Sequence, residues 1–107
     1  MLKKANRLAK SKDILTTLAR GRTFFNPYYT VKFLSGAERK FTVVISTKVF
    51  KRANRRNRLK RIVREHLQKN MLMFKPGNYA VLVKPKAATL PESEQLKYFL
   101  EVLTKLK

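Results

Sequence analysis

The stretch KRANRRNRLKRIVR, residues 51–64, carries the strongest structural signal in the chain. Eight of its fourteen residues are Lys or Arg, and none is acidic. Apolar residues recur within it and just after it at helical spacing, at Leu59, Ile62, Val63 and Leu67. Such a stripe is typical of a helix that packs one side against a sheet or another helix. The pattern therefore predicts a basic helix from about Ala53 to Met71, which ends before Pro76-Gly77.

The polar side of this helix concentrates charge of one sign. A helical wheel at about 100° per residue assigns to it Arg56, Asn57, Lys60, Arg61 and Arg64, with Arg58 on a separate flank. A face that serves only solubility mixes signs at i,i+4 spacing, whereas Arg56, Lys60 and Arg64 are like charges that repel. A bound polyanion would relieve this repulsion. The pattern favours a nucleic-acid contact over a merely solvated face.

The composition indicates one folded domain over residues 1–107. The chain is 44% hydrophobic and 10% aromatic, with a net charge of +20 and no cysteine. This apolar content is too high for a disordered polycation, and the absence of cysteine excludes a disulfide framework or a zinc finger. No apolar run approaches the roughly 20 residues of a membrane span. The basic N-terminus lacks the apolar segment of a secretory signal. We therefore expect a cytoplasmic protein.

The remaining elements follow from periodicity and turn residues. A short helix is expected to begin at Ser11. Strands are expected at Tyr28–Leu34 and Lys40–Ser46, which alternate, and at Tyr79–Val83, which is almost wholly apolar and therefore central. Pro91 opens a last helix. The expected core stripe of that helix is Leu96, Phe99, Leu100, Leu103 and Leu106. These elements predict an α+β fold, a sheet with helices packed on it.

The polar faces of the first two strands form a second candidate surface. Tyr28, Thr30 and Lys32 alternate with apolar positions in one strand, as Thr42 and Ser46 do in the next. An aromatic ring, hydroxyls and an amine suit an unpaired nucleic-acid strand that lies on a sheet. An ordinary solvent-facing sheet surface has the same composition, so the pattern alone leaves both interpretations open.

An independent active site is not indicated. Metal-dependent phosphodiester cleavage needs convergent carboxylates, and metal-free cleavage usually needs paired acid and base groups. The six acidic residues are scattered over separate elements. The one histidine, His66, lies near the apolar stripe of the basic helix, where a partly buried packing role is expected.

Three motifs together resemble a known family. The run VVISTKVFKRANRRNRLKRIVRE, residues 43–65, contains Arg56-Asn57-Arg58, which resembles the RNR motif of bacterial ribonuclease P proteins. Asn6-Arg7-Leu8 near the start and Val83-Lys84-Pro85 near the end are similar to other segments of that family. Its members are the protein subunit of the RNA-based enzyme that matures tRNA 5′ ends. The resemblance covers essentially the whole chain.

The resemblance implies a specific fold and a division of labour. The implied fold is a single-domain α+β sandwich of a four-stranded sheet and three helices, in the order α-β-β-β-α-β-α, with a left-handed β-α-β crossover. The implied function is that of an endoribonuclease acting as a holoenzyme. The RNA subunit would perform Mg²⁺-dependent hydrolysis. The protein, one per RNA and without catalytic residues of its own, would bind ribonuclease P RNA and the 5′ leader of precursor tRNA.

The resemblance also assigns residues to two contacts. The RNA-subunit contact maps onto Arg56, Asn57, Arg58, Lys60, Arg61 and Arg64. The leader groove maps onto Ile14, Leu18, Tyr28, Thr30, Lys32, Thr42, Val44 and Ser46. Many family members have aromatic residues in the first helix where this chain has Ile14 and Leu18, which cannot stack on bases as a ring does. Tyr28 is therefore expected to carry more of the stacking.

Two other functions are compatible with the composition. A basic ribosomal or other structural RNA-binding protein would share the size, charge and fold class. A DNA-binding protein would place the basic helix in the major groove, although no helix-turn-helix accompanies it.

Overall fold

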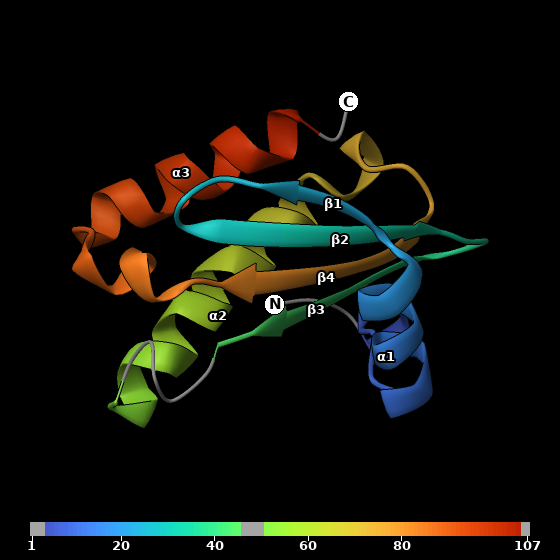
Figure 1. Ribbon diagram of the computed structural model, residues 1–107, viewed down its shortest axis with the longest axis horizontal. Coiled ribbons are helices and arrows are strands. Elements are labelled where there is room, and N and C mark those ends of the chain that lie inside the picture. The colour runs from blue at the N-terminus through green and yellow to red at the C-terminus, as the bar shows by residue number, and fades with distance from the viewer. Residues whose placement is uncertain (1–3, 46–50, 106–107) are drawn as a thin grey trace.

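A four-stranded mixed sheet organises the chain (Figure 1). Its strands are β1 (Arg22–Phe25), β2 (Tyr29–Ser35), β3 (Arg39–Val44) and β4 (Gly77–Val83). The helices are α1 (Ser11–Arg20), α2 (Ala53–Lys69) and α3 (Glu92–Thr104), and short 3-10 turns span Lys4–Asn6, Met71–Met73 and Pro85–Thr89. The structure is a computed structural model that describes residues 4–45 and 51–105. Its element order confirms the predicted α-β-β-β-α-β-α arrangement.

Strand β4 lies inside the sheet, whose spatial order is β1-β2-β4-β3. It pairs antiparallel with β2 and parallel with β3. Tyr79, Ala80 and Val81 are all buried, because helices cover β4 on both faces. The central position predicted from this apolar run is confirmed. Gly77 begins the strand at a φ of 156°, where a Cβ would meet the Phe33 ring and the Leu34 carbonyl oxygen.

Helix α2 connects the parallel strands β3 and β4. In Figure 1 both arrows point left, β3 lies below β4, and α2 passes behind the sheet. The connection is therefore left-handed, the uncommon sense for a β-α-β unit. This agrees with the crossover implied by the sequence resemblance.

The main core lies between the sheet and the helices α2 and α3. It contains Tyr29, Val31, Phe41, Val43, Tyr79, Val81 and Val83 from the strands, and Leu59, Val63, Leu67, Phe99 and Val102 from the helices. The three α2 residues are at most 2% exposed, and Ile62 is half-buried beside them. The stripe predicted for the basic helix is confirmed.

The predicted stripe of α3 is partly wrong. Phe99 is fully buried as expected, but Leu100 is exposed, and Val102 and Gln95 are buried instead. Gln95 is buried because its side-chain amide donates to the carbonyl oxygens of Ala87 and Leu90. A polar residue with satisfied hydrogen bonds can occupy a core position that an apolar pattern would not assign to it. Leu106 lies outside the described residues.

Helix α1 covers part of the opposite face of the sheet. It contacts β2 and β4, and Ala80, which alternates with the core residues of β4, is fully buried. Thr17 is the buried residue of α1, and its hydroxyl donates to the carbonyl oxygen of Asp13. Gly21 is the C-cap of the helix and its N–H donates to the Thr17 carbonyl oxygen. A Cβ at this position would meet the same oxygen, so the close approach requires glycine.

The hairpin from β1 to β2 was only partly predicted from the sequence. The strand expected at Tyr28–Leu34 begins at Tyr29, and β1 was not placed. Asn26 closes the hairpin: its side-chain oxygen accepts from the amides of Tyr28 and Tyr29, at 2.9 and 2.8 Å. Its amide nitrogen donates to the carbonyl oxygen of Tyr98 at 2.8 Å, which ties the turn to α3.

Replacement of Asn26 should destabilise the fold. This side chain is 3% exposed, so Asn26→Ala leaves two amides and one carbonyl without their partner. We expect a loss of about 2–4 kcal/mol in the free energy of unfolding, measured by urea titration. Asn57→Ala on the exposed surface of α2 is the control and should change stability by about 0.5 kcal/mol or less. Equal effects of the two substitutions would contradict the role assigned to Asn26.

Candidate nucleic-acid interface

The charged side chains of helix α2 are almost all positive. Its seventeen residues include seven Lys or Arg and one acid, Glu65, and the first turn contains no acidic residue. The N-cap residue Arg52 makes no side-chain capping hydrogen bond. Positive side chains at a helix N-terminus oppose the helix dipole, which favours anions there. The helix therefore has an arrangement that a bound polyanion would stabilise.

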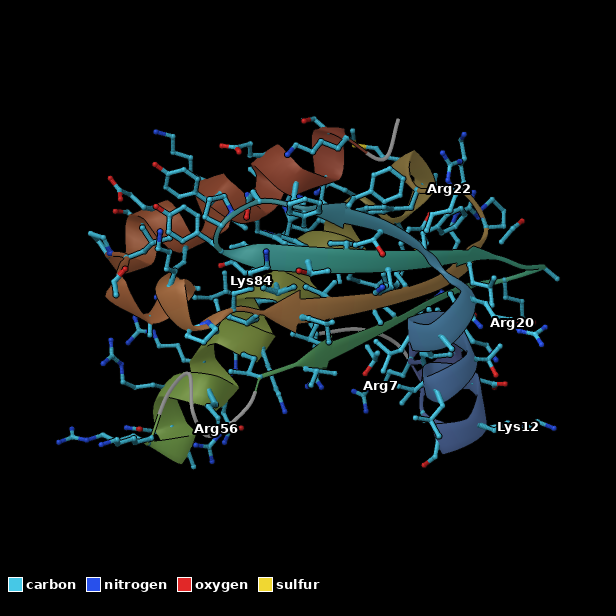
Figure 2. The ribbon with its side chains drawn as sticks, in the orientation of Figure 1. Arg7, Lys12, Arg20, Arg22, Arg56 and Lys84 are labelled. Carbon is cyan, nitrogen blue, oxygen red and sulfur yellow. The ribbon has the colours of Figure 1, made fainter. Side chains whose placement is uncertain are left out.

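Five of the six α2 residues predicted to contact RNA have the positions on the helix that the sequence indicated, and the position of the sixth is corrected. Asn57, Arg58 and Arg61 are exposed, and Lys60 and Arg64 are half-buried on the same side of the helix as Arg61. Arg56 was assigned to this polar side, but it lies three residues before Leu59, in line with the buried stripe. It is half-buried, and its guanidinium donates to the carbonyl oxygen of Lys51 at 3.2 Å. Figure 2 shows Arg56 at the N-terminal end of α2, where the helix extends past the sheet.

The face of the sheet that α2 and α3 do not cover is built from residues in register. One row across β1, β2, β4 and β3 is Phe25, Thr30, Leu82 and Val44. The adjacent row is Thr23, Lys32, Ala80 and Thr42. Neighbouring strands align these side chains on one face, about 5 Å apart from strand to strand. We call this surface the open face.

Four of the eight predicted groove residues lie on the open face. Thr30, Lys32 and Thr42 are half-buried there and Val44 is exposed. The ammonium of Lys32 donates to the Thr23 hydroxyl at 2.7 Å. Ile14 and Leu18 are half-buried on α1, four residues apart and therefore on one side of the helix, which contacts β2 and β4. Ser46 lies outside the described residues.

Tyr28 does not lie on the open face. It precedes β2, and its ring packs against Tyr98 of α3, with the ring centroids 4.5 Å apart. The expectation that Tyr28 supplies the stacking surface beside Thr30 and Lys32 is therefore wrong. The alternation of the strand does not extend to Tyr28, because the Asn26 side chain accepts from the Tyr28 amide and turns the chain there.

Sequence reasoning missed the residues that β1 and β4 add to this face. Phe25 lies beside Thr30, and Leu82 and Ala80 separate the β2 residues from the β3 residues. The signal for Phe25 was the apolar pair Phe24-Phe25 directly before Asn26-Pro27, a short strand that enters a turn. The order of β2, β4 and β3 has no comparable signal, because it depends on the crossover.

Cations surround the open face. Figure 2 shows Lys12 and Arg20 on α1, Arg7 between α1 and β3, and Lys84 at the end of the sheet away from α1. Arg7 is held at the edge of β3, where the amide of the next residue, Leu8, donates to the Phe41 carbonyl oxygen at 2.8 Å. The chain carries 26 Lys and Arg against six acids, so this face attracts anions at long range.

Acid–base groups do not gather on either surface. Within residues 4–45 and 51–105, no three His, Cys, Asp or Glu side chains are close enough together to hold a metal ion. None of the helices in these ranges has the length and apolar character to cross a membrane.

His66 is half-buried on the side of α2 that faces the core, in the packing role that the sequence indicated. Its ring meets Phe99 edge-on at 6.1 Å, and the Asn70 amide lies 3.3 Å from its Nδ1. It also lines an apolar cavity of about 210 Å³ together with Phe33, Phe74 and Leu103. Burial, and then the charge of Lys69, lower the pKa of His66 below its ordinary value of 6.5. The ring is therefore neutral at physiological pH.

These features define a class: a basic, single-domain α+β protein with a cationic helix and an open sheet face, both suited to a polyanion. Residues 2–107 match the family described as Ribonuclease P. A ribonuclease P protein component from Exiguobacterium is 29% identical over 107 residues, which cover 99% of this chain and 94% of that one. Another from Pseudanabaena is 31% identical over 99 residues, covering 90% of this chain and 85% of that one.

The fold agrees with this match. The RNase P protein of Staphylococcus aureus superposes with a TM-score of 0.90 over 97% of both chains, at 20% sequence identity. The chain belongs to the ribonuclease P protein family. As a member, it is the protein part of a ribonucleoprotein endoribonuclease that processes tRNA 5′ ends, and its partner is ribonuclease P RNA. The ribosomal and DNA-binding alternatives are set aside.

The lowered pKa of His66 predicts a specific pH dependence of stability. Between the folded pKa and 6.5 the unfolded chain binds more protons at this residue, so its contribution is full above pH 6.5 and falls as the pH drops. We expect His66→Gln to lose less stability than the wild type between pH 7 and pH 5. Urea titrations at stepped pH measure the difference. Parallel curves for the two proteins would contradict the neutral, desolvated state of the ring.

Proposed function

We propose that the two surfaces bind different RNAs. The α2 surface, Asn57, Arg58, Lys60, Arg61 and Arg64, contacts ribonuclease P RNA, with Arg56 at its edge. The open face, bordered by Ile14 and Leu18 of α1, receives the single-stranded 5′ leader of precursor tRNA. The observation that carries this proposal is the register of Thr30, Leu82 and Val44, and of Lys32, Ala80 and Thr42, across three strands.

The chemistry of each surface supports its assignment. The α2 surface has guanidinium and ammonium groups and little apolar area, which suits phosphates and gives affinity that depends on salt. The open face combines hydroxyls, an amine and apolar side chains on a pleated surface. Such a mixture suits unpaired bases, whose faces are apolar and whose edges and phosphates are polar. A folded tRNA body has no comparable unpaired strand at its mature 5′ end.

We place the hydrolytic chemistry on the RNA subunit, with Mg²⁺ acting there. Of the described acids, Asp13 lies in α1, Glu38 before β3, Glu65 in α2, and Glu94 and Glu101 in α3, and no three of them converge. They do not fit a catalytic magnesium site, which needs several oxygen ligands at one point. The proposal includes one protein per RNA and a cytoplasmic location.

Loss of α2 arginines should weaken assembly with the RNA subunit. Arg61 is exposed and Arg64 is half-buried on the same side. We expect Arg61→Ala and Arg64→Ala each to lower the log–log salt slope of RNA-subunit binding by about one, because each removes about one phosphate contact. Filter binding over a range of potassium concentrations measures this slope.

The matched control is Lys97→Ala, which removes one exposed positive charge from α3. It lowers the net charge by the same amount but should leave the slope nearly unchanged. If all three variants change the slope equally, only net charge matters, and α2 is not the contact surface.

The leader assignment predicts a change in preference between two tRNA forms. Lys32→Glu places a carboxylate on the open face, where a leader phosphate would pass. In reconstituted holoenzyme we expect this variant to bind precursor tRNA about tenfold more weakly, while its affinity for mature tRNA changes little. The ratio of the two affinities is the measured quantity.

Lys97→Glu gives the same charge reversal on α3 and serves as the control. Its ratio should match that of the wild type. Protein without RNA subunit is tested in parallel and should not cleave the precursor. An unchanged ratio in Lys32→Glu would mean that the leader lies elsewhere.

A further inference from the structure

We propose that Phe25 forms a stacking site for one unpaired base of the leader, with the ammonium of Lys84 beside it. This inference rests on the proposed function, because the base belongs to the RNA strand that crosses the open face. It adds β1 to a groove that the family resemblance assigned to α1, β2 and β3.

Phe25 is unusual among the aromatic residues of this chain. This residue is 59% exposed. The rings of Tyr29, Phe41, Tyr79 and Phe99 are buried, and Phe24, Tyr28, Phe33, Phe74 and Tyr98 pack against the core. Within residues 4–45 and 51–105, Phe25 is therefore the one exposed aromatic residue, and the others are buried or half-buried. An unpaired base needs such an accessible ring in order to stack.

The position of Phe25 continues the open face. Phe25 pairs with Thr30, Thr30 with Leu82, and Val44 with Leu82, so these four residues form one row across the sheet. Three strand spacings make this row about 14 Å long. The adjacent row contains Ala80, which is fully buried in the sheet that α1 contacts. The row of Phe25 is thus the more exposed of the two, with Phe25 59% and Val44 41% exposed, and a strand that crosses the open face meets Phe25 at its β1 end.

Two lysines bring positive charge to this end of the row. The ammonium of Lys84 lies 5.0 Å from the centre of the Phe25 ring and donates to the Asn26 carbonyl oxygen at 2.8 Å. The ammonium of Lys105 donates to the Phe25 carbonyl oxygen at 2.7 Å. The residue as a whole is 59% exposed with Lys84 in place. A base can therefore stack on it while these ammonium groups attract its phosphate.

The exposure of Phe25 also needs a reason. Strand β1 is an edge strand, and exposed apolar residues on an edge favour unwanted pairing with other chains. A base partner accounts for the ring here, since Ile14 and Leu18 leave α1 without aromatic groups and Tyr28 is held by Tyr98. The competing occupant is a second copy of the chain, joined through β1.

The test uses reconstituted holoenzyme and precursors that carry 2-aminopurine at successive single leader positions. The variants are Phe25→Leu, which keeps apolar area but has no ring, and Phe25→Trp, which keeps a ring. In the wild type, we expect fluorescence quenching at one or two adjacent positions. Phe25→Leu should lose this quenching and bind precursor about tenfold more weakly, whereas Phe25→Trp should retain both.

Leu72→Ala is the matched control, because Leu72 is 86% exposed in the turn after α2 and not on the open face. It should change neither quenching nor affinity. RNA-subunit affinity measured for every variant verifies that the fold is intact. Lys84→Met should reduce the salt dependence of precursor binding and weaken it, which supports the ammonium's role.

The possible outcomes distinguish a failure of the Phe25 stacking site from a failure of the leader assignment on which it rests. If the wild-type holoenzyme shows no preference for precursor over mature tRNA, the leader assignment itself fails. If the preference is present but Phe25→Leu leaves quenching and the affinity ratio unchanged, the stacking site is wrong and the open face stands. A change in sedimentation of the free protein, without any change in quenching, would assign Phe25 to contact between copies.

Discussion

The burial of β4 on both faces is the constraint from which the two surfaces follow. Its core-side residues hold α2 and α3, and Ala80 on the other side lies in the part of the sheet that α1 contacts. Because β4 lies between β2 and β3, the hydroxyls of Thr30 and Thr42 are separated by a strand with small or apolar side chains. The open face is therefore apolar along β4 and combines hydroxyls, an amine and the apolar residues Phe25 and Val44 on the other strands, a mixture that matches the apolar faces and charged backbone of an unpaired strand.

Charge is concentrated where the fold can hold it rigidly. Leu59, Val63 and Leu67 fix α2 on the sheet, so the arginines on its far side cannot move apart to relieve their repulsion. The left-handed crossover puts this helix behind the sheet in Figure 1, with its N-terminal end beyond the sheet edge. A disordered tail of equal charge would lose more conformational entropy on binding RNA. The rigid helix avoids that cost but depends on the core beneath it.

Sequence reasoning predicted features that follow a local period. The α2 stripe is of this kind, because burial on one side repeats every few residues. The unbroken apolar run of β4 predicted a central strand, and the element order that includes β1 was implied by the family resemblance. Arg56 was assigned to the polar side with the other basic residues, although its angle places it with the stripe. The stripe can include an arginine there because this end of α2 extends past the sheet and leaves Arg56 half-buried. Tyr28 was misassigned because one side-chain hydrogen bond from Asn26 ends the strand alternation. Phe25 was missed because the pairing of β1 with β2 is a tertiary feature without a period of its own.

Both surfaces belong to one rigid unit, and this has a consequence for how two RNAs meet on it. Strand β3 supplies Thr42 and Val44 to the open face, and the chain that leaves β3 leads into α2. On the proposed assignment, the RNA subunit on α2 and the leader on the sheet are therefore held relative to each other by the packing of Leu59, Val63 and Leu67 against the sheet. Positioning of this kind lowers the entropy loss when both RNAs come together. A small protein without a convergent cluster of acids in its described residues can contribute to cleavage in this way, by orientation and charge.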